Sequence, residues 1–518
     1  MAAHDNTRRT IHKPLSWGLF SLGIFLVALL FGLFGCRAHP APTPPWPDQR
    51  KAMRPPYTSQ LSLPALADAP SYRLRETVDL AQRVVQGTAH IRLTNRTSAS
   101  WDSIVLRLYP NLLHYGGRME VSQLLGDGSP LPFDYNQTHT ALRGLLPQLL
   151  KPGDSITLDV TFATHYRTWN LDGYWLFGEY DGLLNMPLSY PVLAVPNDDG
   201  TWRVEDGIPL GDTLVAESSF YHVWLTVPAT MTVVSSAVVS ATQTYTTSTD
   251  VTYELVSGPA REFTFMLSPL YEVKQRTVNG ILVRSYYFLG DEDTGEAALN
   301  YAAAALQVYS RHFGPYPFAK MDIASAMLLN RGMEYPLLTQ LGRDLYGPEQ
   351  RKLEFLVAHE VGHQWWYNQV GNDQIQEPWL DEGLTEYSTY YYYQDIYGRD
   401  DADAVLHNRW ELPLEYIRRK GLDAPLDLPA SAYTRDNYEI IVYGKGALFF
   451  HTLRHRLGDR MFERVLQTYL ERYRYRLATA KDLQRVIEDV SGQDVQDLFA
   501  TWVYGSPTSS PVTSPEDR

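Results

Sequence analysis

The chain has 518 residues, of which 44% are apolar and 20% are charged, and its formal net charge is −14. This length and balance are typical of a globular protein with two or three domains and large cores. The acidic charge argues against a nucleic-acid partner, because phosphate backbones select basic surfaces. Cys36 is the single cysteine, so no disulfide can form within the chain.

Residues 1–36 have the pattern of an export segment. Positive residues precede an uncharged run, residues 15–35, which is long enough to span a bilayer. The positive flank predicts that everything after this run lies outside the cytoplasm. Cys36 follows Leu-Phe-Gly, which resembles a bacterial lipobox, so a lipid anchor and an uncleaved transmembrane signal anchor both remain open. Either anchor would tie the chain to the cell membrane, facing the extracytoplasmic side.

A proline-rich segment follows the export segment. Seven prolines fall between Pro40 and Pro56, so residues 37–70 are expected to form an extended, semi-stiff tether. At the other end of the chain, residues 506–518 are rich in serine, threonine and proline, which predicts a disordered tail.

Residues 71–275 alternate apolar and polar side chains. In one run Ile156, Leu158, Val160 and Phe162 share a face, and polar residues separate them. Alternation with period two, broken by turn residues, is typical of antiparallel strands with one buried face. We therefore predict an N-terminal antiparallel β-sandwich or saddle, and we expect no chemically active residue in it.

From Asp291 the spacing becomes helical. Ala297, Tyr301, Ala304 and Val308 form an apolar stripe, and further helices are expected to about Tyr504. Residues 276–505 are therefore predicted to form a second, mostly helical domain. The fold class expected for the whole chain is α+β with more than one domain.

His359 and His363 stand four positions apart in a helical stretch, with Glu360 beside the first of them. Positions i and i+4 of a helix share one face, so both imidazoles can reach one metal ion. A catalytic zinc site needs a third protein ligand and one open position, and two His with one Glu is a known set. Glu382, nineteen residues after His363, is the candidate third ligand. A histidine pair in an ordinary core would not explain Glu360 between two buried imidazoles.

This pattern, with Glu382 inside Trp-Leu-Asp-Glu-Gly, resembles the zinc aminopeptidases of peptidase family M1, the membrane alanyl aminopeptidase type among the gluzincins. Two more motifs agree. Residues 332–336, Gly-Met-Glu-Tyr-Pro, resemble the family's GxMEN exopeptidase motif, and residues 443–446, Tyr-Gly-Lys-Gly, resemble its YxKG motif. The resemblance is strongest from about Asn300 to Trp502, and it implies a thermolysin-like zinc metallopeptidase domain.

The resemblance implies a catalytic role for five residues. One Zn²⁺ per chain, held by His359, His363 and Glu382, would activate water and polarise the carbonyl of a peptide substrate. Glu360 would be the general base and then the acid that protonates the leaving amine. Tyr443 would donate a hydrogen bond to the developing oxyanion; its structural alternative is packing at a helix end.

The resemblance also implies a substrate-binding strand. Glu334 would pair with the free α-ammonium of the substrate, and the backbone of Gly332 and Met333 would lie along the peptide. Two departures from the family motif stand next to these residues: Arg331 replaces a glycine, and Tyr335 replaces an asparagine. The side chain of Arg331 would crowd or charge the pocket if it pointed inward.

Three further positions are weaker candidates. Glu386 lies one helical turn after the glutamate ligand, and it is either a hydrogen-bond acceptor for a ligand imidazole or a solvated glutamate. Tyr438 is a candidate for a supporting role near the YxKG tyrosine. A second histidine pair, His451 and His455, has no acid between its members and has arginines beside them, so we interpret it as ordinary helix residues.

The sequence therefore predicts a membrane-tethered zinc aminopeptidase that hydrolyses N-terminal residues of peptides outside the cytoplasm. A zinc endopeptidase or an epoxide hydrolase could use the same centre, but Glu334 favours the exopeptidase. A non-catalytic binding scaffold is a further alternative, against which the intact Glu360 and ligand set argue. The implied partners are peptide substrates and the membrane.

Overall fold

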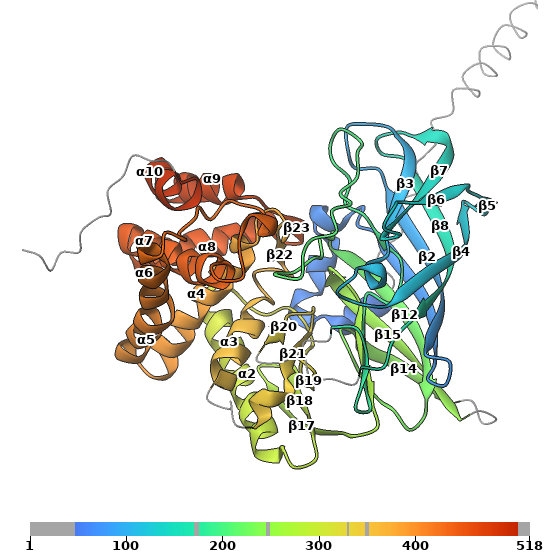
Figure 1. Ribbon diagram of the computed structural model, residues 1–518, viewed down its shortest axis with the longest axis horizontal. Helices are drawn as coiled ribbons and strands as arrows, with labels where there is room; N and C mark the ends of the chain where they lie inside the picture. Colours follow the sequence, from blue (N-terminus) through green and yellow to red (C-terminus); the bar gives the residue numbers. More distant parts are fainter. Residues whose placement is uncertain (1–46, 170–175, 245–248, 329–330, 348–351, 506–518) are drawn as a thin grey trace, which may run out of the picture. The chain divides into compact units, whose positions relative to one another are not determined.

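The computed structural model describes residues 47–169, 176–244, 249–328, 331–347 and 352–505 (Figure 1). The predicted anchor, residues 1–36, and the predicted tail, residues 506–518, lie outside these ranges. Within the described ranges, each helix is too short or too polar to cross a bilayer.

An eight-stranded sheet dominates the β-rich region. The burial of β1 alternates along the strand, so one face of the strand packs into the core and the other does not, as its sequence predicts. Among the named strands of this sheet, β1 and β12 are the parallel pair, a departure from the expected purely antiparallel arrangement. In spatial order the strands are β14 (Val238–Thr244), β15 (Asp250–Ala260), β12 (Ser219–Pro228), β1 (Ser71–Asp79), β2 (Val84–Thr94), β8 (Ser155–His165), β4 (Arg118–Gly126) and β5 (Ser129–Pro130).

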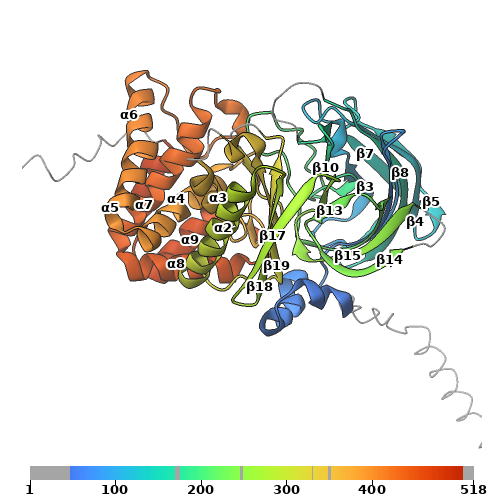
Figure 2. The same ribbon diagram turned by 90° about the horizontal axis from the view of Figure 1, so that it is seen from below.

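Two four-stranded sheets complete this region (Figure 2). One has the order β13 (Thr232–Ser235), β16 (Thr264–Ser268), β10 (Leu183–Pro187) and β9 (Gly178–Tyr180). The other has the order β11 (Val192–Leu193), β3 (Trp101–Arg107), β7 (Ala141–Leu150) and β6 (Phe133–Tyr135). Their inward side chains share one hydrophobic core with the eight-stranded sheet.

A five-stranded sheet lies between this core and the helices. Its order is β17 (Tyr271–Val278), β18 (Ile281–Phe288), β19 (Lys320–Ala326), β21 (Leu338–Gly342) and β20 (Gly332–Met333), so β20 is an edge strand. In β18 and β19 side chains of both faces are buried, as period two predicts: Val283 and Ile323 pack with the helices, whereas Tyr286 and Ala324 pack with the β-rich core.

The helices follow the five-stranded sheet in the chain, and α2 and α3 pack on it (Figure 2). The α-helices are α2 (Glu292–His312), α3 (Leu353–Gly362), α4 (Trp379–Ile396), α5 (Arg399–Val405), α6 (Leu412–Arg419), α7 (Gly446–Leu457), α8 (Asp459–Tyr473), α9 (Ala480–Ser491) and α10 (Gln496–Leu498). Among the described residues, the π-helical segments are η7 (Leu406–Glu411), η9 (Ile440–Lys445) and η10 (Phe499–Val503), and β22 (Val370–Gly371) pairs with β23 (Arg476–Leu477). The predicted α+β class, with a β region before a helical region, is confirmed.

The expected tether is wrong over the part of it that the structure describes. Residues 47–66 form three 3₁₀ helices, η1 (Pro47–Ala52), η2 (Pro55–Ser62) and η3 (Pro64–Leu66), which each begin at a proline. The φ angle that proline imposes is compatible with both a helical and an extended backbone, so proline content alone does not distinguish a 3₁₀ helix from an extended tether. The apolar side chains Met53, Leu61 and Leu66 decide the outcome, because they are buried in the helical core.

Candidate metal centre and active site

The three predicted metal ligands come together in the structure. Helix α3 carries His359, His363 follows its last residue, and Glu382 stands in the first turn of α4. The Nε2 atoms of the two histidines are 3.2 Å apart. The Glu382 Oε2 atom lies 3.1 Å from Nε2 of His359 and 3.3 Å from Nε2 of His363. All three side chains are buried.

This donor set fits a zinc ion. Ligand atoms roughly 2.0–2.2 Å from a tetrahedral zinc lie roughly 3.2–3.6 Å from one another, close to the three separations found here. The second ring nitrogens lie close to oxygen atoms: Nδ1 of His359 is 3.0 Å from Glu386 Oε2, and Nδ1 of His363 is 3.0 Å from the carbonyl oxygen of Trp366. A proton on each Nδ1 leaves both Nε2 lone pairs directed at the same point.

The electrostatics of the cluster favour a cation. Burial lowers the pKa of His359, but hydrogen bonds to Glu382 and Glu386 outweigh burial and raise that pKa to about 9. Burial also opposes ionisation of Glu382, yet the two imidazoles hold its pKa below the usual range. The carboxylates therefore stabilise positive charge at the point that the three ligand atoms share.

Glu360 and Glu334 face the same centre. Donor atoms of Glu334, Glu360 and His363 all lie within 4.8 Å of one another. Burial raises the pKa of Glu360 to about 8. The edge strand β20 passes so close that a Cβ at Gly332 would lie 1.9 Å from Oε1 of Glu360. A glycine at this position therefore lets the strand reach the carboxylate.

Glu386 is buried, so the alternative of a solvated glutamate is wrong. Its Oε1 atom accepts hydrogen bonds from Nε of Arg409 at 2.6 Å and from Nε1 of Trp410 at 2.8 Å. Its Oε2 atom faces His359, as described above. The two oxygens thus join a metal-ligand candidate to segment η7. Sequence reasoning missed Arg409 and Trp410, because nothing in their local pattern indicates contact with a residue more than twenty positions away.

Tyr443 reaches the centre because two helical segments cross at glycines. A Cβ at Gly446 would lie 2.8 Å from the Cα of Gly383, so larger residues would push α4 and α7 apart. With the segments this close, the Tyr443 hydroxyl donates a 2.6 Å hydrogen bond to Oε1 of Glu382. Tyr438 packs edge-on against the Tyr443 ring, with centroids 6.2 Å apart.

The β-rich region contributes to the site, contrary to expectation. A narrow cavity beside Glu334 is lined by Asp212 and Glu262 from that region and by Gln374, whose Nε2 donates to Glu334 Oε1 at 3.1 Å. We call it the Glu262 cavity. Sequence reasoning missed these residues because the alternation of apolar and polar side chains around them indicates strands and does not indicate a site. Tyr335 lines this cavity, whereas the Arg331 side chain is exposed and is not among the lining residues.

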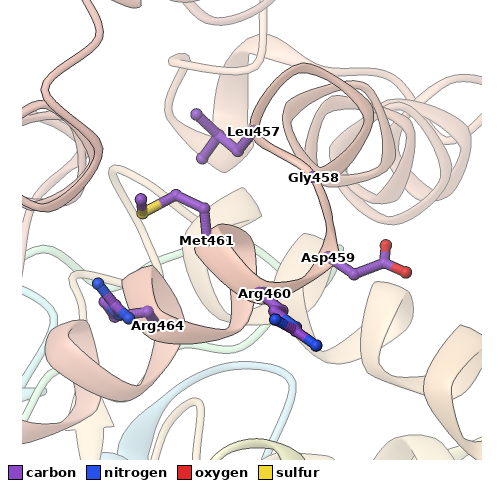
Figure 3. Close-up of a pocket in the computed structure, with 6 residues that line it drawn as sticks. All are labelled: Leu457, Gly458, Asp459, Arg460, Met461 and Arg464. Carbon is purple, nitrogen blue, oxygen red and sulfur yellow. The ribbon is translucent and has the colours of Figure 1, made fainter.

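Two other features lie apart from this centre. A surface hollow of about 390 Å³ lies at the turn between α7 and α8, and its lining residues Gly458, Asp459 and Arg460 are exposed (Figure 3). On α7, the Nε2 atoms of His451 and His455 are 3.0 Å apart. Neither histidine belongs to a group of three potential metal ligands among the described residues.

Comparison with known proteins finds similarity mainly over the helical region. Residues 297–502 match the model described as the peptidase family M1 domain. Aminopeptidase M1-B of Oryza sativa subsp. japonica is 27% identical over 283 residues, which cover 48% of this chain and 31% of the relative. Aminopeptidase M1 of Arabidopsis thaliana is 29% identical over 251 residues, which cover 44% of this chain and 27% of the relative. The matched part thus spans less than a third of each of these curated relatives.

A solved structure extends the likeness to the β-rich region. The M1 zinc metallopeptidase from Deinococcus radiodurans superposes with a TM-score of 0.64 at 20% identity, and the match covers 86% of this chain and 96% of that chain. At this identity the likeness shows a shared fold. The family match includes the candidate ligands His359, His363 and Glu382 and the acid Glu360. Residues 297–502 therefore resemble a peptidase family M1 domain.

Proposed function

We propose that this chain is a zinc-dependent aminopeptidase that removes the N-terminal residue of peptides. The observation that carries the proposal is the convergence of Nε2 of His359, Nε2 of His363 and Oε2 of Glu382 to within 3.1–3.3 Å, with Glu360 and Glu334 facing the same point. The M1 matches support it, since the relatives are named aminopeptidases and the solved neighbour a zinc metallopeptidase.

His359, His363 and Glu382 would hold one zinc ion, which would polarise the scissile carbonyl and make a water more acidic. Glu360 accepts the proton of the attacking water and later donates it to the departing amine. Burial of Glu360 suits this role, because a raised pKa lets one carboxyl both take up and release a proton near neutral pH.

The other residues position the reaction. Glu386 fixes the tautomer of His359 through Nδ1, as described above, and so keeps Nε2 available for the metal. The Tyr443 phenol lies beside Glu382 and donates to the negative oxygen that develops in the tetrahedral intermediate. Tyr438 packs against Tyr443 and limits its ring to this orientation.

Glu334 favours an aminopeptidase over an endopeptidase or epoxide hydrolase. Its carboxylate lies within 4.8 Å of the centre, at the end of β20, where Gly332 and Met333 present their backbone to a peptide. Gln374 holds one of its oxygens, which leaves the other for a substrate ammonium. An internal peptide bond has no ammonium to offer, so its binding would leave this buried carboxylate unpaired.

The cellular setting is a separate part of the proposal. The uncharged run over residues 15–35 supports a membrane anchor and an extracytoplasmic catalytic region. The divisions proposed are an anchor over residues 1–36, a β-rich region over residues 71–275, a catalytic region over residues 276–505 and a tail over residues 506–518. Cys36→Ala tests the anchor: loss of an acyl label indicates a lipoprotein, and an unchanged membrane fraction indicates a signal anchor. Recovery of the full-length chain in the non-membrane fraction would contradict both.

Activity on matched substrates tests the proposal. Zinc-stripped and zinc-reloaded enzyme should be assayed on aminoacyl fluorophores with a free or an acetylated amine. We expect zinc-dependent turnover and a loss of at least about 100-fold in kcat/KM on acetylation, because a charge-assisted hydrogen bond and the pairing of a buried carboxylate are lost together. Glu334→Gln should reduce the difference in kcat/KM between free and acetylated substrates. Equal cleavage of free and acetylated substrates would contradict the aminopeptidase and leave the endopeptidase alternative.

A further inference from the structure

The Glu262 cavity contains a buried carboxylate oxygen that the chain does not satisfy. Glu262 is fully buried; its Oε2 accepts a hydrogen bond from the Tyr367 hydroxyl, and its Oε1 has no partner among the described residues. Burial raises the pKa of Glu262 to about 8, although the Tyr367 hydrogen bond opposes the rise. A lone buried acceptor of this kind is costly, which points to a donor supplied by a ligand.

The neighbouring arginine does not supply that donor. The guanidinium of Arg261 is committed to the backbone carbonyls of Ala216 at 3.0 Å, Arg476 at 2.9 Å and Tyr367. Asp212 and Glu334 also line the cavity, so three carboxyl groups face one small space. A positively charged group that pairs with Glu262 would therefore come from outside these contacts.

The position of Glu262 separates it from the site for the α-ammonium. An α-ammonium is two bonds from the scissile carbonyl, so it has to bind next to the metal centre. Glu334 meets this condition, because it lies within 4.8 Å of His363 and Glu360. Glu262 is not part of that close group. Because Glu262 lines the same cavity as Glu334, a substrate side chain that enters this cavity would meet Glu262.

The walls and the size of the cavity suit one kind of side chain. Tyr115, Tyr335 and Met333 offer surfaces against which methylene groups can pack. About 20 Å³ is open to a water-sized group, which is enough for an ammonium head group.

We propose that Glu262, with Asp212, binds the side-chain ammonium of the N-terminal residue, so that peptides beginning with lysine are preferred substrates. The inference rests on the proposed aminopeptidase function and names the substrate class of the same site. Norleucine is the matched comparison, because it keeps the methylene chain of lysine and lacks the ammonium.

The test compares kcat/KM for lysyl and norleucyl fluorophores with the zinc-loaded full chain at pH 8. We expect the parent to favour lysine by at least about tenfold, and Glu262→Gln to lower that ratio by at least about tenfold, as expected for loss of a charge-assisted hydrogen bond. The matched control is Glu76→Gln, which changes another buried glutamate of the β-rich region outside the cavity and should keep the parental ratio. The ratio is the readout because misfolding lowers both activities together.

Each failure has a distinct meaning. If zinc-loaded enzyme cleaves neither substrate, the proposed function is contradicted. If it cleaves norleucyl substrate as well as lysyl substrate, or if Glu262→Gln keeps the parental ratio, only the lysine preference is contradicted. If Glu262→Gln does not fold, the inhibition constants of free L-lysine and L-norleucine should be measured for the parent and for Asp212→Asn. A parent that L-lysine inhibits no better than L-norleucine would overturn the proposal. An Asp212→Asn variant that keeps the full parental preference for L-lysine would also overturn it.

Discussion

Glu386→Gln tests whether the buried carboxylate on α4 controls the affinity of the metal centre. Oε1 of Glu386 serves Arg409 and Trp410, and Oε2 faces Nδ1 of His359. A glutamine has one acceptor oxygen and one donor nitrogen, so it cannot accept on both sides. If the oxygen stays with Arg409 and Trp410, the amide donates to Nδ1 of His359. The histidine then carries its proton on Nε2, where the metal would bind.

The magnitude follows from this tautomer change. Outer partners of metal-ligating histidines contribute about 10–100-fold in metal affinity, which is about 1.4–2.7 kcal/mol. Competition with a zinc chelator should show a weaker zinc affinity of this size in Glu386→Gln, and saturating zinc should restore most of the turnover. Glu354→Gln is the control, since Glu354 on α3 accepts from two tyrosines instead of a ligand histidine. A zinc affinity within about twofold of the parent would show that Glu386 does not control metal binding.

Three further substitutions test other parts of the account. Tyr443→Phe should keep its zinc and lower kcat by about 10²–10³-fold with little change in KM, because it removes the oxyanion donor; a kcat within threefold of the parent would contradict that role. Gly332→Ala places a Cβ 1.9 Å from Oε1 of Glu360, so kcat should fall by about 10²-fold while zinc content stays unchanged. A kcat equal to that of the parent would contradict this prediction, because it would mean that β20 moves away from Glu360 without cost. Glu76 has a pKa raised by burial from 4.5 to about 7, so the folded chain keeps a proton that the unfolded chain releases between these values. Glu76 should therefore contribute up to about 3 kcal/mol to a loss of parental stability from pH 4.5 to 7, and this contribution should be missing from Glu76→Gln. An equal loss of stability between pH 5 and pH 8 in the two proteins would contradict it.

The proximity of the two candidate histidine ligands was predictable from the sequence because helix geometry fixes the distance between positions i and i+4. His359 and His363 are brought to one point by one turn of backbone, whatever surrounds them. Glu382 could join them if a second helix packed against the first and brought its carboxylate to the two histidines. The β-rich region was predictable for a similar reason, since a buried face requires alternation, and β1 and β8 show it.

The parts that sequence reasoning missed depend on tertiary contacts. Met53 and Leu61 make residues 47–66 pack as 3₁₀ helices, but a proline-rich segment with scattered apolar residues also suits an extended tether. Glu262 stands in a strand-rich stretch, and only the fold brings it beside Glu334. The parallel pairing of β1 with β12 likewise joins segments more than a hundred residues apart, which local patterns do not encode.

Zinc content and turnover of Glu360→Gln, measured together, separate metal binding from proton transfer at this centre. The substitution leaves His359, His363 and Glu382 in place and removes the general base. We predict about one zinc per chain in both the parent and the variant, as a two-His, one-Glu site requires. Turnover of a free-amine aminoacyl substrate should fall by about 10²–10⁴-fold in the variant. A variant that loses its zinc, or one whose turnover stays within tenfold of the parent, would contradict the account.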